Sequence, residues 1–404
     1  MQNGRIILHN SWLQLFALTA GLAGGLTLYN VFRVNSSLLT PNPVQMNSAA
    51  STATPPVKST NAITTPTPPA PELLTHSRPE DALEEYRKAA KKGDSEAQFQ
   101  LALAYYYGKT VSRDFVEANK WFRSAAEQHH AEAQGYLGGD YYYGRGTDRD
   151  SYEAVKWWHQ AAANGIKEAQ YELAECYLDG DGVSRDESQA ANWFRQAAEA
   201  GDVHSQSKLG ELYLHGIGVK GDLLEAAKWF QKAAKQGDAL SQVNVGVMCA
   251  KGEGGMRQDD AEAFDWYMKA AIQGEAAAQC NLAHMYFFGQ GVSPDKSEGL
   301  KWLKKSVDQG YAAAQCDMAM LCLGDGKVVH RNINRAVLLL KSAVEQGDAQ
   351  SEELLGYCYE SGTGVAKDVS KAVELWKKAA RQGNEDAINA LKRAHIPFQR
   401  DTEP

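Results

Sequence analysis

Two short patterns in the sequence place a serine three residues before a lysine, a spacing that some penicillin-recognising enzymes use at their nucleophile. The pairs are Ser205 with Lys208 and Ser293 with Lys296. The motifs that accompany such a serine in those enzymes, S-D-N and K-T-G, do not occur with either pair. We therefore predict that neither serine is a catalytic nucleophile.

Two glycine-containing segments have letters in common with nucleotide-binding loops. GIGVKG, residues 216–221, fits a dinucleotide fingerprint, but it follows a predicted helix instead of the strand that this fingerprint requires. Gly108-Lys109-Thr110 ends like a phosphate-binding loop, yet Leu103 stands where that loop needs its first glycine. Neither segment predicts a nucleotide site.

Cys280 and His284 are four residues apart and would share one face of a helix, a spacing that can hold a metal ion. No second pair with ligand spacing is evident, so we favour a place in a groove or in the core. The six cysteines show no regular pairing, and we interpret them as small buried residues. No cofactor, metal site or catalytic residue is predicted.

The charge of the chain excludes one class of partner. Residues 1–79 carry a net charge of +3, and because the whole chain carries −8, residues 80–404 carry −11. An acidic surface repels phosphate groups. We expect no nucleic acid partner.

The N-terminal part of the chain has the pattern of a membrane anchor. Residues 11–32 hold no charged side chain over a length that can cross a bilayer, and Arg5 and Arg33 flank them. We expect a transmembrane helix or signal anchor in residues 1–35; a signal peptide cleaved near Ala23, giving a secreted protein, is the alternative. Eight of the twelve prolines fall in residues 36–78, which predicts a disordered linker.

One sequence pattern recurs eight times from Ala97 onward, with starts 36 or 37 residues apart, and the short motifs above lie within it. A fixed period of this length indicates a helical solenoid, here over residues 79–404, in which each unit buries its apolar face against its neighbours. Helix-like half units at 80–92 and 384–394 flank the array. The predicted repeats are 97–132, 133–168, 169–204, 205–240, 241–277, 278–313, 314–350 and 351–386.

Each repeat is predicted to fold as two helices. In the first helix, apolar residues at positions five and nine share one face, a small residue at position six allows close approach of a second helix, and glycines then end the helix. In the second helix, alanines three residues before and four after a large side chain predict that this side chain packs between helices. These large residues are Trp121, Trp157, Trp193, Trp229, Trp266, Trp302, Leu339 and Leu375.

The recurring motifs L-[AG]-x-x-Y, G-x-G-V and A-x-x-W-[FWY]-x-x-A-A-x-x-G resemble those of the Sel-one-like repeat (SLR) family, relatives of the tetratricopeptide repeats. The resemblance covers residues 80–394. It implies an all-α fold, a right-handed α-solenoid of helical hairpins, that serves as a scaffold or adaptor. Bacterial members of the family are often exported or anchored to the envelope, and some bind toxins as immunity proteins.

By the resemblance to tetratricopeptide repeats, positions three, seven, ten and eleven of each first helix line a concave groove. Aromatic residues predominate there at the start and again further on, with acidic residues between them. We predict that this groove binds a protein or peptide, with Lys or Arg of the partner facing the acidic part. The predicted partner-binding residues are Phe99, Tyr106, Tyr107, Tyr142, Tyr143, Tyr171, Glu175, Asp179, Glu211, His215, Phe287 and Phe288.

The predicted function is a non-catalytic scaffold in a bacterial envelope, secretion or signalling complex. It would be a single-pass protein of the inner membrane with its solenoid in the periplasm. One alternative is an immunity protein that neutralises a secreted toxin. Another, from a different class, is a penicillin-hydrolase-like enzyme or a glycan-binding module that acts on the cell wall. A eukaryotic origin would instead place the solenoid in the endoplasmic reticulum.

Overall fold

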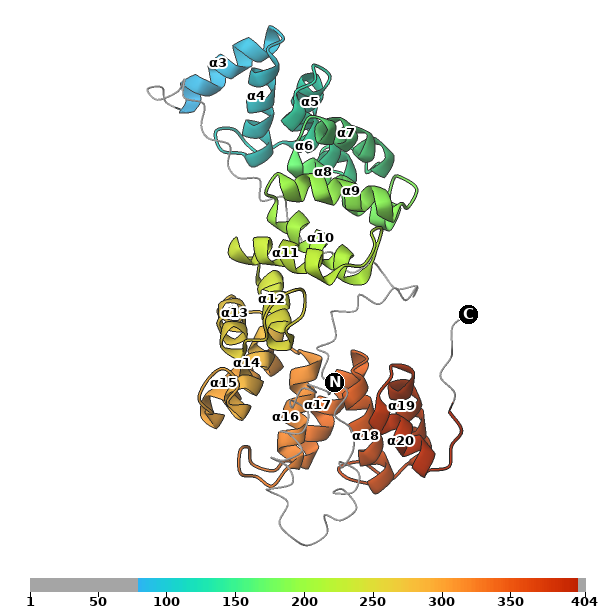
Figure 1. Ribbon diagram of the computed structural model, residues 1–404. Coiled ribbons are helices and arrows are strands. Elements are labelled where there is room, and N and C mark those ends of the chain that lie inside the picture. The colour runs from blue at the N-terminus through green and yellow to red at the C-terminus, as the bar shows by residue number, and fades with distance from the viewer. Residues whose placement is uncertain (1–78, 399–404) are drawn as a thin grey trace. The chain divides into compact units, whose positions relative to one another are not determined.

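The computed structural model describes residues 79–398, and this part of the chain is helical without any strand (Figure 1). Eight hairpins of two helices follow one another and confirm the predicted all-α solenoid. The first helices are α4 (Ser95–Tyr107), α6 (Ala131–Tyr143), α8 (Lys167–Asp179), α10 (Val203–His215), α12 (Ala239–Lys251), α14 (Ala276–Phe288), α16 (Ala312–Leu323) and α18 (Ala349–Ser361). The second helices are α5 (Phe115–Ala126), α7 (Ser151–Ala163), α9 (Glu187–Glu199), α11 (Leu223–Lys235), α13 (Asp260–Ile272), α15 (Lys296–Asp308), α17 (Ile333–Glu345) and α19 (Val369–Arg381).

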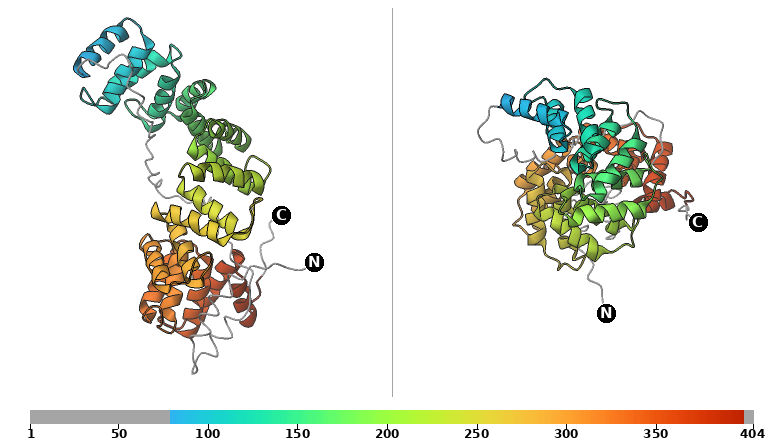
Figure 2. Two further views of the ribbon diagram at one scale, coloured as in Figure 1. Left: turned by 60° about the vertical axis from the view of Figure 1, so that its left-hand side comes forward. Right: turned by 90° about the horizontal axis from the view of Figure 1, so that it is seen from above.

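Single helices flank the hairpins, α3 (Pro79–Lys91) before them and α20 (Glu385–Arg393) after them. The helical array divides into two compact units at Asp238, which is also the end of a hairpin. The first unit holds α3 to α11 and the second holds α12 to α20. Within each unit the hairpins stack in sequence order (Figure 2).

The predicted membrane segment at residues 11–32 and the predicted linker at residues 36–78 lie outside the described residues. Among residues 79–398, no helix combines the length and the apolar character that crossing a bilayer requires.

Local sequence signals begin and end the helices. An aspartate caps most second helices; in α7, for example, the side chain of Asp150 accepts from the backbone N–H groups of Tyr152 and Glu153. Glycine in the left-handed conformation ends most first helices, as predicted, and Gly180 after α8 has φ 73°. Gly182 follows with φ 74°, and a side chain on it would collide with the carbonyl of Ser151 in the preceding hairpin. This loop therefore packs directly on α7.

The two helices of a hairpin are in close contact at position six of the first helix. A Cβ atom added to Gly138 would lie 2.5 Å from Cδ1 of Trp158, and one added to Gly210 would lie 2.7 Å from Cδ1 of Phe230. Where position six is alanine, the facing residue can be smaller, as with Ala283 in α14 and Leu303 in α15. The predicted close approach at a small residue is confirmed.

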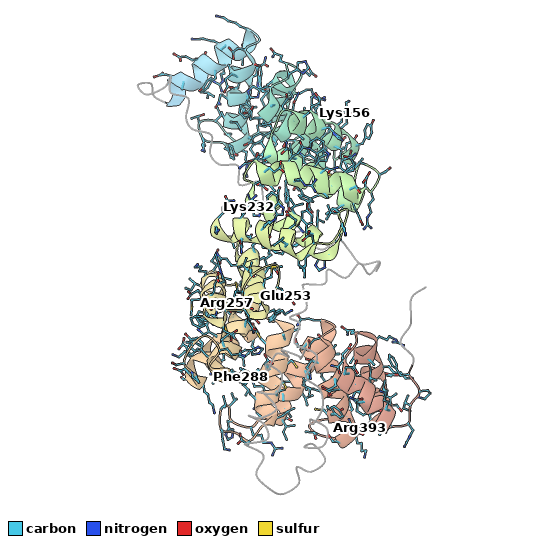
Figure 3. The ribbon with its side chains drawn as sticks, viewed as in Figure 1. Lys156, Lys232, Glu253, Arg257, Phe288 and Arg393 are labelled. Atoms are coloured by element: carbon cyan, nitrogen blue, oxygen red, sulfur yellow. The ribbon has the colours of Figure 1, made fainter. Side chains whose placement is uncertain are left out.

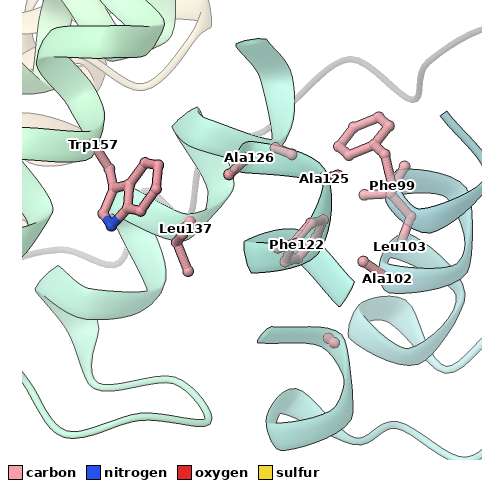
Figure 4. Packing of buried hydrophobic residues seen from close by; sticks show 10 residues of the cluster. Phe99, Ala102, Leu103, Phe122, Ala125, Ala126, Leu137 and Trp157 are labelled. Carbon is pink, nitrogen blue, oxygen red and sulfur yellow. The ribbon is translucent and has the colours of Figure 1, made fainter. Parts of the chain in front are cut away.

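The most deeply buried large side chain of each second helix is the residue that follows the predicted one. These residues are Phe122, Trp158, Phe194, Phe230, Tyr267, Leu303, Leu340 and Trp376. In the first hairpin, Phe122 faces Ala102 and Leu103 of α4, whereas Trp157 joins the same core beside Leu137 (Figure 4). Trp157 and Trp229 belong to buried clusters, as predicted, but the residue one position later, which points about 100° away on the helix, is buried more deeply.

The predicted tryptophans lie at the edge of the core, and lysine side chains cover three of them, Trp229, Trp266 and Trp302. Lys232 Nζ lies 3.7 Å from the ring centroid of Trp229, and Lys232 projects from α11 (Figure 3). Lys305 lies 3.8 Å from the ring centroid of Trp302 in the same way. The tryptophan therefore combines burial with a cation–π contact to a lysine one turn later.

A buried glutamine joins consecutive hairpins. The side-chain amide of Gln134 in α6 donates to the carbonyl oxygen of Ala126 at the end of α5, at 3.2 Å, and its oxygen accepts from Asn164 after α7, at 3.3 Å. Each first helix carries a residue at this place, which we call the ladder position. The ladder residues are Gln98, Gln134, Gln170 and Gln206 in the first unit and Gln242, Gln279, Gln315 and Glu352 in the second.

The ladder has one defect, in the third hairpin. The residue that donates to the glutamine oxygen is glutamine or asparagine in the other hairpins, but Ala200 occupies this place after α9. Accordingly, the buried side-chain oxygen of Gln170 has no hydrogen-bond partner among the described residues. An unpaired buried acceptor costs roughly 1–3 kcal/mol.

We predict that Ala200→Gln stabilises the protein by about 1 kcal/mol, because the new amide can donate to Gln170 as Gln236 donates to Gln206 at 2.8 Å. Ala200→Glu is the matched control, since it has nearly the same shape but cannot donate. Urea denaturation followed by circular dichroism measures both. A midpoint for the glutamine variant no higher than that of the glutamate variant would contradict the role of the ladder.

Candidate partner-binding surface

The predicted partner-binding residues lie on first helices, as expected from their repeat positions. Those on α4, α6, α8 and α10 belong to the first unit, and those on α14 belong to the second. The structure brings the tyrosines of the first two hairpins together with residues that the sequence did not single out. It also places two of the predicted residues inside the core.

A tyrosine cluster forms where α4 ends against α6. The ring centroids of Tyr106 and Tyr107 are 5.1 Å apart, and Tyr136 of α6 lies 5.5 Å from Tyr106. The hydroxyl groups of Tyr107 and Tyr136 are 3.0 Å apart, within hydrogen-bond distance. Tyr136 was not predicted, because it occupies position four of its repeat and only the stacking of hairpins brings it to this place.

Arg145 joins this cluster to the next pair of tyrosines. Its guanidinium group lies 4.5 Å from the ring centroid of Tyr143 and donates a hydrogen bond to the hydroxyl of Tyr106. Tyr143 in turn lies 5.1 Å from Tyr142. Arg145 comes from the loop after α6, so the first-helix pattern could not identify it. We call Tyr106, Tyr107, Tyr136, Tyr142, Tyr143 and Arg145 the tyrosine surface.

Position eleven faces outward in these hairpins, and position ten packs inward. Tyr107 and Tyr143 are 40% and 45% exposed. Tyr106 lies 5.2 Å from Phe115, and Tyr142 lies 5.3 Å from Trp158, so both rings also pack on the second helix of their own hairpin. The outward tyrosines are therefore the ones with area available to a partner.

Phe99 and Phe287 contribute to the core, in contrast to the other predicted residues. Phe99 is 5% exposed and packs among Phe122, His130 and Tyr136. Phe287 is 4% exposed. A Cβ atom added to Gly299 of α15 would lie 3.3 Å from the Phe287 ring, so the two helices touch there. Neither phenylalanine presents enough surface to bind a partner, whereas Phe288 is half-buried (Figure 3).

The acidic part of the predicted surface also contains a lysine, Lys208, which pairs with one of the carboxylates. Lys208 Nζ lies 3.4 Å from a carboxylate oxygen of Glu211. Burial by itself would lower the pKa of Lys208, but the charges of Glu211 and Glu175 outweigh burial and raise that pKa. Asp179 is exposed beside this group, and His215 is exposed at the end of α10. The carboxylates still outnumber the lysine.

Tyr171 of α8 lies between the aromatic and the acidic parts. Its ring is half-buried, 5.5 Å from Phe194 and 6.2 Å from His204. Burial, followed by the negative charges of Glu175 and Glu172, raises the pKa of Tyr171. The hydroxyl group therefore stays protonated and can donate a hydrogen bond at neutral pH.

Asp140 lies buried beneath the tyrosine surface. Its Oδ2 atom is 3.5 Å from the side-chain amide of Asn119, and its other carboxyl oxygen has no hydrogen-bond partner among the described residues. Burial raises the pKa of Asp140 to about 8, although the charge of Arg145 acts in the opposite direction. Near neutral pH this carboxyl group is therefore largely protonated.

The serine–lysine pairs do not form accessible nucleophilic sites. Ser205 is fully buried in α10, and the lysine of its pair, Lys208, contacts Glu211. Ser293 and Lys296 are exposed and separate from each other, the serine in a loop and the lysine at the start of α15. All six cysteines are free and buried, as the sequence predicts.

The chain matches the Sel1 repeat family model at residues 95–130, 131–166, 167–202, 203–238, 239–275, 276–311, 312–348 and 349–384. These eight repeats begin two residues before the predicted ones, at the starts of the first helices. No curated protein sequence matches the chain.

Three solved structures illustrate the likeness. The protective antigen c5321 of uropathogenic Escherichia coli, which displays an SLR fold, has 34% sequence identity and a TM-score of 0.62 over 78% of this chain and 67% of that chain. A Sel1 repeat protein from Oxalobacter formigenes has 33% identity and a TM-score of 0.56 over 77% of this chain and 90% of that chain. The immunity protein Pa5087 from Pseudomonas aeruginosa has 16% identity and a TM-score of 0.31 over 53% of this chain and 81% of that chain.

We predict that Asp140→Asn stabilises the protein at pH 8 relative to the unchanged chain. A carboxyl group with a raised pKa contributes its full stability only below the unfolded pKa, near 3.9, and loses it as the pH rises to about 8. The difference should therefore grow from pH 5 to pH 8, by at most about 4 kcal/mol, since each unit is worth about 1.4 kcal/mol.

Urea denaturation at several pH values measures this difference. Asp148→Asn, which changes an exposed aspartate in the following loop, is the control and should show little pH-dependent difference. Parallel pH profiles for Asp140→Asn and the unchanged chain would show that the buried carboxyl does not titrate as described.

Proposed function

Because the chain belongs to the Sel1 repeat family, we propose that it is a non-catalytic scaffold that binds a protein or peptide through its first helices. The observation that carries the proposal is the tyrosine surface. Two outward tyrosines, Tyr107 and Tyr143, are held in place by Tyr136 and Arg145, respectively, on consecutive hairpins of one unit. The resemblance to tetratricopeptide repeats supports a place for this surface in the concave groove of a right-handed superhelix.

Rigidly held tyrosines are well suited to recognition. A tyrosine side chain offers a large area with few rotatable bonds, so little conformational entropy is lost on binding. Here the hydroxyl contact between Tyr107 and Tyr136, and the stacking of Arg145 on Tyr143, restrict the rings further. Binding energy at interfaces is concentrated in such aromatic and arginine residues.

The acidic residues next to the tyrosines favour a partner segment with basic residues. Glu175, Asp179 and Glu211 form this part of the surface, and Lys208 neutralises only one of their charges. A lysine or arginine of the partner would experience a net negative field, which increases the association rate and improves specificity more than it increases affinity.

We further propose that residues 11–32 anchor the protein in the inner membrane, with residues 36–78 as a tether and the repeats in the periplasm. The uncharged apolar run and the proline-rich segment after it support this arrangement. The scaffold would then act in an envelope, secretion or signalling complex. An immunity protein would use the same surface to bind a toxin. Identifying the captured partner would distinguish this role from that of a scaffold.

We predict that Tyr107→Ala with Tyr143→Ala abolishes capture of one specific partner by the protein used as bait. Affinity capture with mass spectrometry measures this loss, and circular dichroism checks that the variant is folded. Tyr152→Ala is the matched control, because Tyr152 is exposed on the second helix α7 of the same hairpin as Tyr143 and should keep the partner.

The same assay tests the acidic part of the surface. Asp179→Asn with Glu211→Gln should weaken binding a few-fold at low salt and have less effect at high salt. Glu199→Gln, at the exposed end of α9, is the control.

If the tyrosine double variant and the Tyr152→Ala control retain the same partner equally well, the proposed surface is not the binding site.

A further inference from the structure

Three side chains that commonly bind metal ions converge between two first helices of the second unit. Cys280 and His284 lie one turn apart on α14, and Asp317 comes from α16 of the next hairpin. Cys280 Sγ is 3.4 Å from Asp317 Oδ2, His284 Nε2 is 2.6 Å from the same oxygen, and Sγ and Nε2 are 4.0 Å apart. The sequence could suggest only the first two residues, because Asp317 is 33 residues beyond His284.

These contacts form a triangle, which distinguishes them from a catalytic relay. In a cysteine–histidine–aspartate relay, the nucleophile and the aspartate bind opposite nitrogens of the imidazole ring. Here the sulfur and the carboxylate oxygen both face the same nitrogen, Nε2 of His284, and also face each other. One sulfur, one nitrogen and one oxygen thus lie within 4.0 Å of one another, close enough to bind the same ion.

We propose that Cys280, His284 and Asp317 bind one zinc-type divalent ion, with the fourth tetrahedral position open. This inference is independent of the proposed partner surface. Zinc binds thiolate, imidazole and carboxylate donors, and sites with three protein ligands leave one position for water or another ligand. Magnesium and calcium prefer oxygen ligands alone, so the donor set disfavours them.

The distances fit tetrahedral zinc after a small adjustment. Zinc–ligand bonds of about 2.0–2.3 Å at tetrahedral angles place nitrogen and oxygen about 3.3 Å apart and sulfur about 3.6 Å from either. The pair of His284 and Asp317 must therefore separate by about 0.7 Å, which breaks their hydrogen bond, and the two sulfur distances change by less. Side-chain rotation on two neighbouring helices can supply a movement of this size.

The electrostatics also favour an ion. Asp317 is 7% exposed, and its hydrogen-bond partners are an imidazole and a thiol, of which the thiol is a weak donor. Cys280 is 2% exposed, so an ion bound there would be shielded from water on the sulfur side. A thiolate, a carboxylate and a neutral imidazole carry two negative charges, which neutralise one divalent cation. Binding would release the thiol proton, and any second proton on His284, to solvent.

The site falls on the variable part of the repeat. At the junction between α8 and α10 in the first unit, the residues equivalent to His284 and Asp317 are Glu175 and Lys208. These two residues bear opposite charges. The residue equivalent to Cys280 in the following repeat is Cys316, which is likewise buried. The repeat fold does not require a metal-binding trio at this junction, so the coincidence of three ligand types is specific to it. His284 is 25% exposed on its side chain and provides a route of entry.

Titration of the full chain with Co²⁺ tests the proposal. The protein is purified under reducing conditions and treated with a chelator, and Co²⁺ then serves as a coloured substitute for Zn²⁺. We expect one equivalent to produce visible bands of a tetrahedral ion and a thiolate-to-cobalt charge-transfer band, both removed by added Zn²⁺. Cys280→Ser should lose the charge-transfer band. Cys316→Ser is the matched control and should keep it.

A second measurement covers the case in which Cys280→Ser does not fold. Zn²⁺ should raise the thermal midpoint of the unchanged protein, because an ion that binds only the folded state stabilises it, and His284→Ala at its half-buried position should remove this shift. A charge-transfer band that is absent from the unchanged protein, or that persists in folded Cys280→Ser, would overturn the proposal. So would an equal thermal shift in His284→Ala.

Discussion

Within each unit, a buried side chain at the ladder position, glutamine in all but the last hairpin, restrains how one hairpin packs on the next. Gln134 of α6 is an example. Its side chain hydrogen-bonds to the backbone at the end of α5 and to the side chain of Asn164 after α7. Three helix segments thus meet at one side chain. Because an unpaired amide in the core costs roughly 1–3 kcal/mol, rotation of a hairpin away from this geometry is penalised, and apolar packing alone carries no such directional restraint.

This repeated joint determines which residues become neighbours across hairpins. Tyr106 contacts Tyr136 and Arg145, and His284 contacts Asp317, because consecutive hairpins of the same unit pack on each other. The constant positions of the repeat produce the fold. The positions between them are free to vary, and they carry aromatic, acidic and metal-ligand chemistry at different places along the chain.

Much of the fold could be predicted from the sequence, because helix-ending glycines and regularly spaced apolar residues act locally. The errors arise where three-dimensional neighbours decide. The sequence pattern predicts that Trp229 packs between helices, and it is buried, but the pattern does not single out Phe230, one position later, which faces Gly210 and is fully buried. Phe99 was assigned to the binding surface, yet His130 and Tyr136 from the following hairpin cover it.

Most of the candidate site could not be found by counting within one helix. Arg145 lies in a loop, and Tyr136 lies at position four of its repeat. Neither belongs to positions three, seven, ten and eleven, which the sequence predicts to line the groove. Lys208 could have been noticed in the sequence, because it is three residues from Glu211. Its pKa, however, also depends on Glu175 of the preceding hairpin, and only the structure shows that this carboxylate is near.

In the proposed function, the first helices form the recognition surface and the second helices form its support. Hydrogen–deuterium exchange of the protein with and without its captured partner distinguishes these two roles. We expect slower exchange on binding at the ends of α4 and α6 and in the loop that contains Arg145, with α5 and α7 unchanged. Protection confined to α5 and α7 would contradict this assignment.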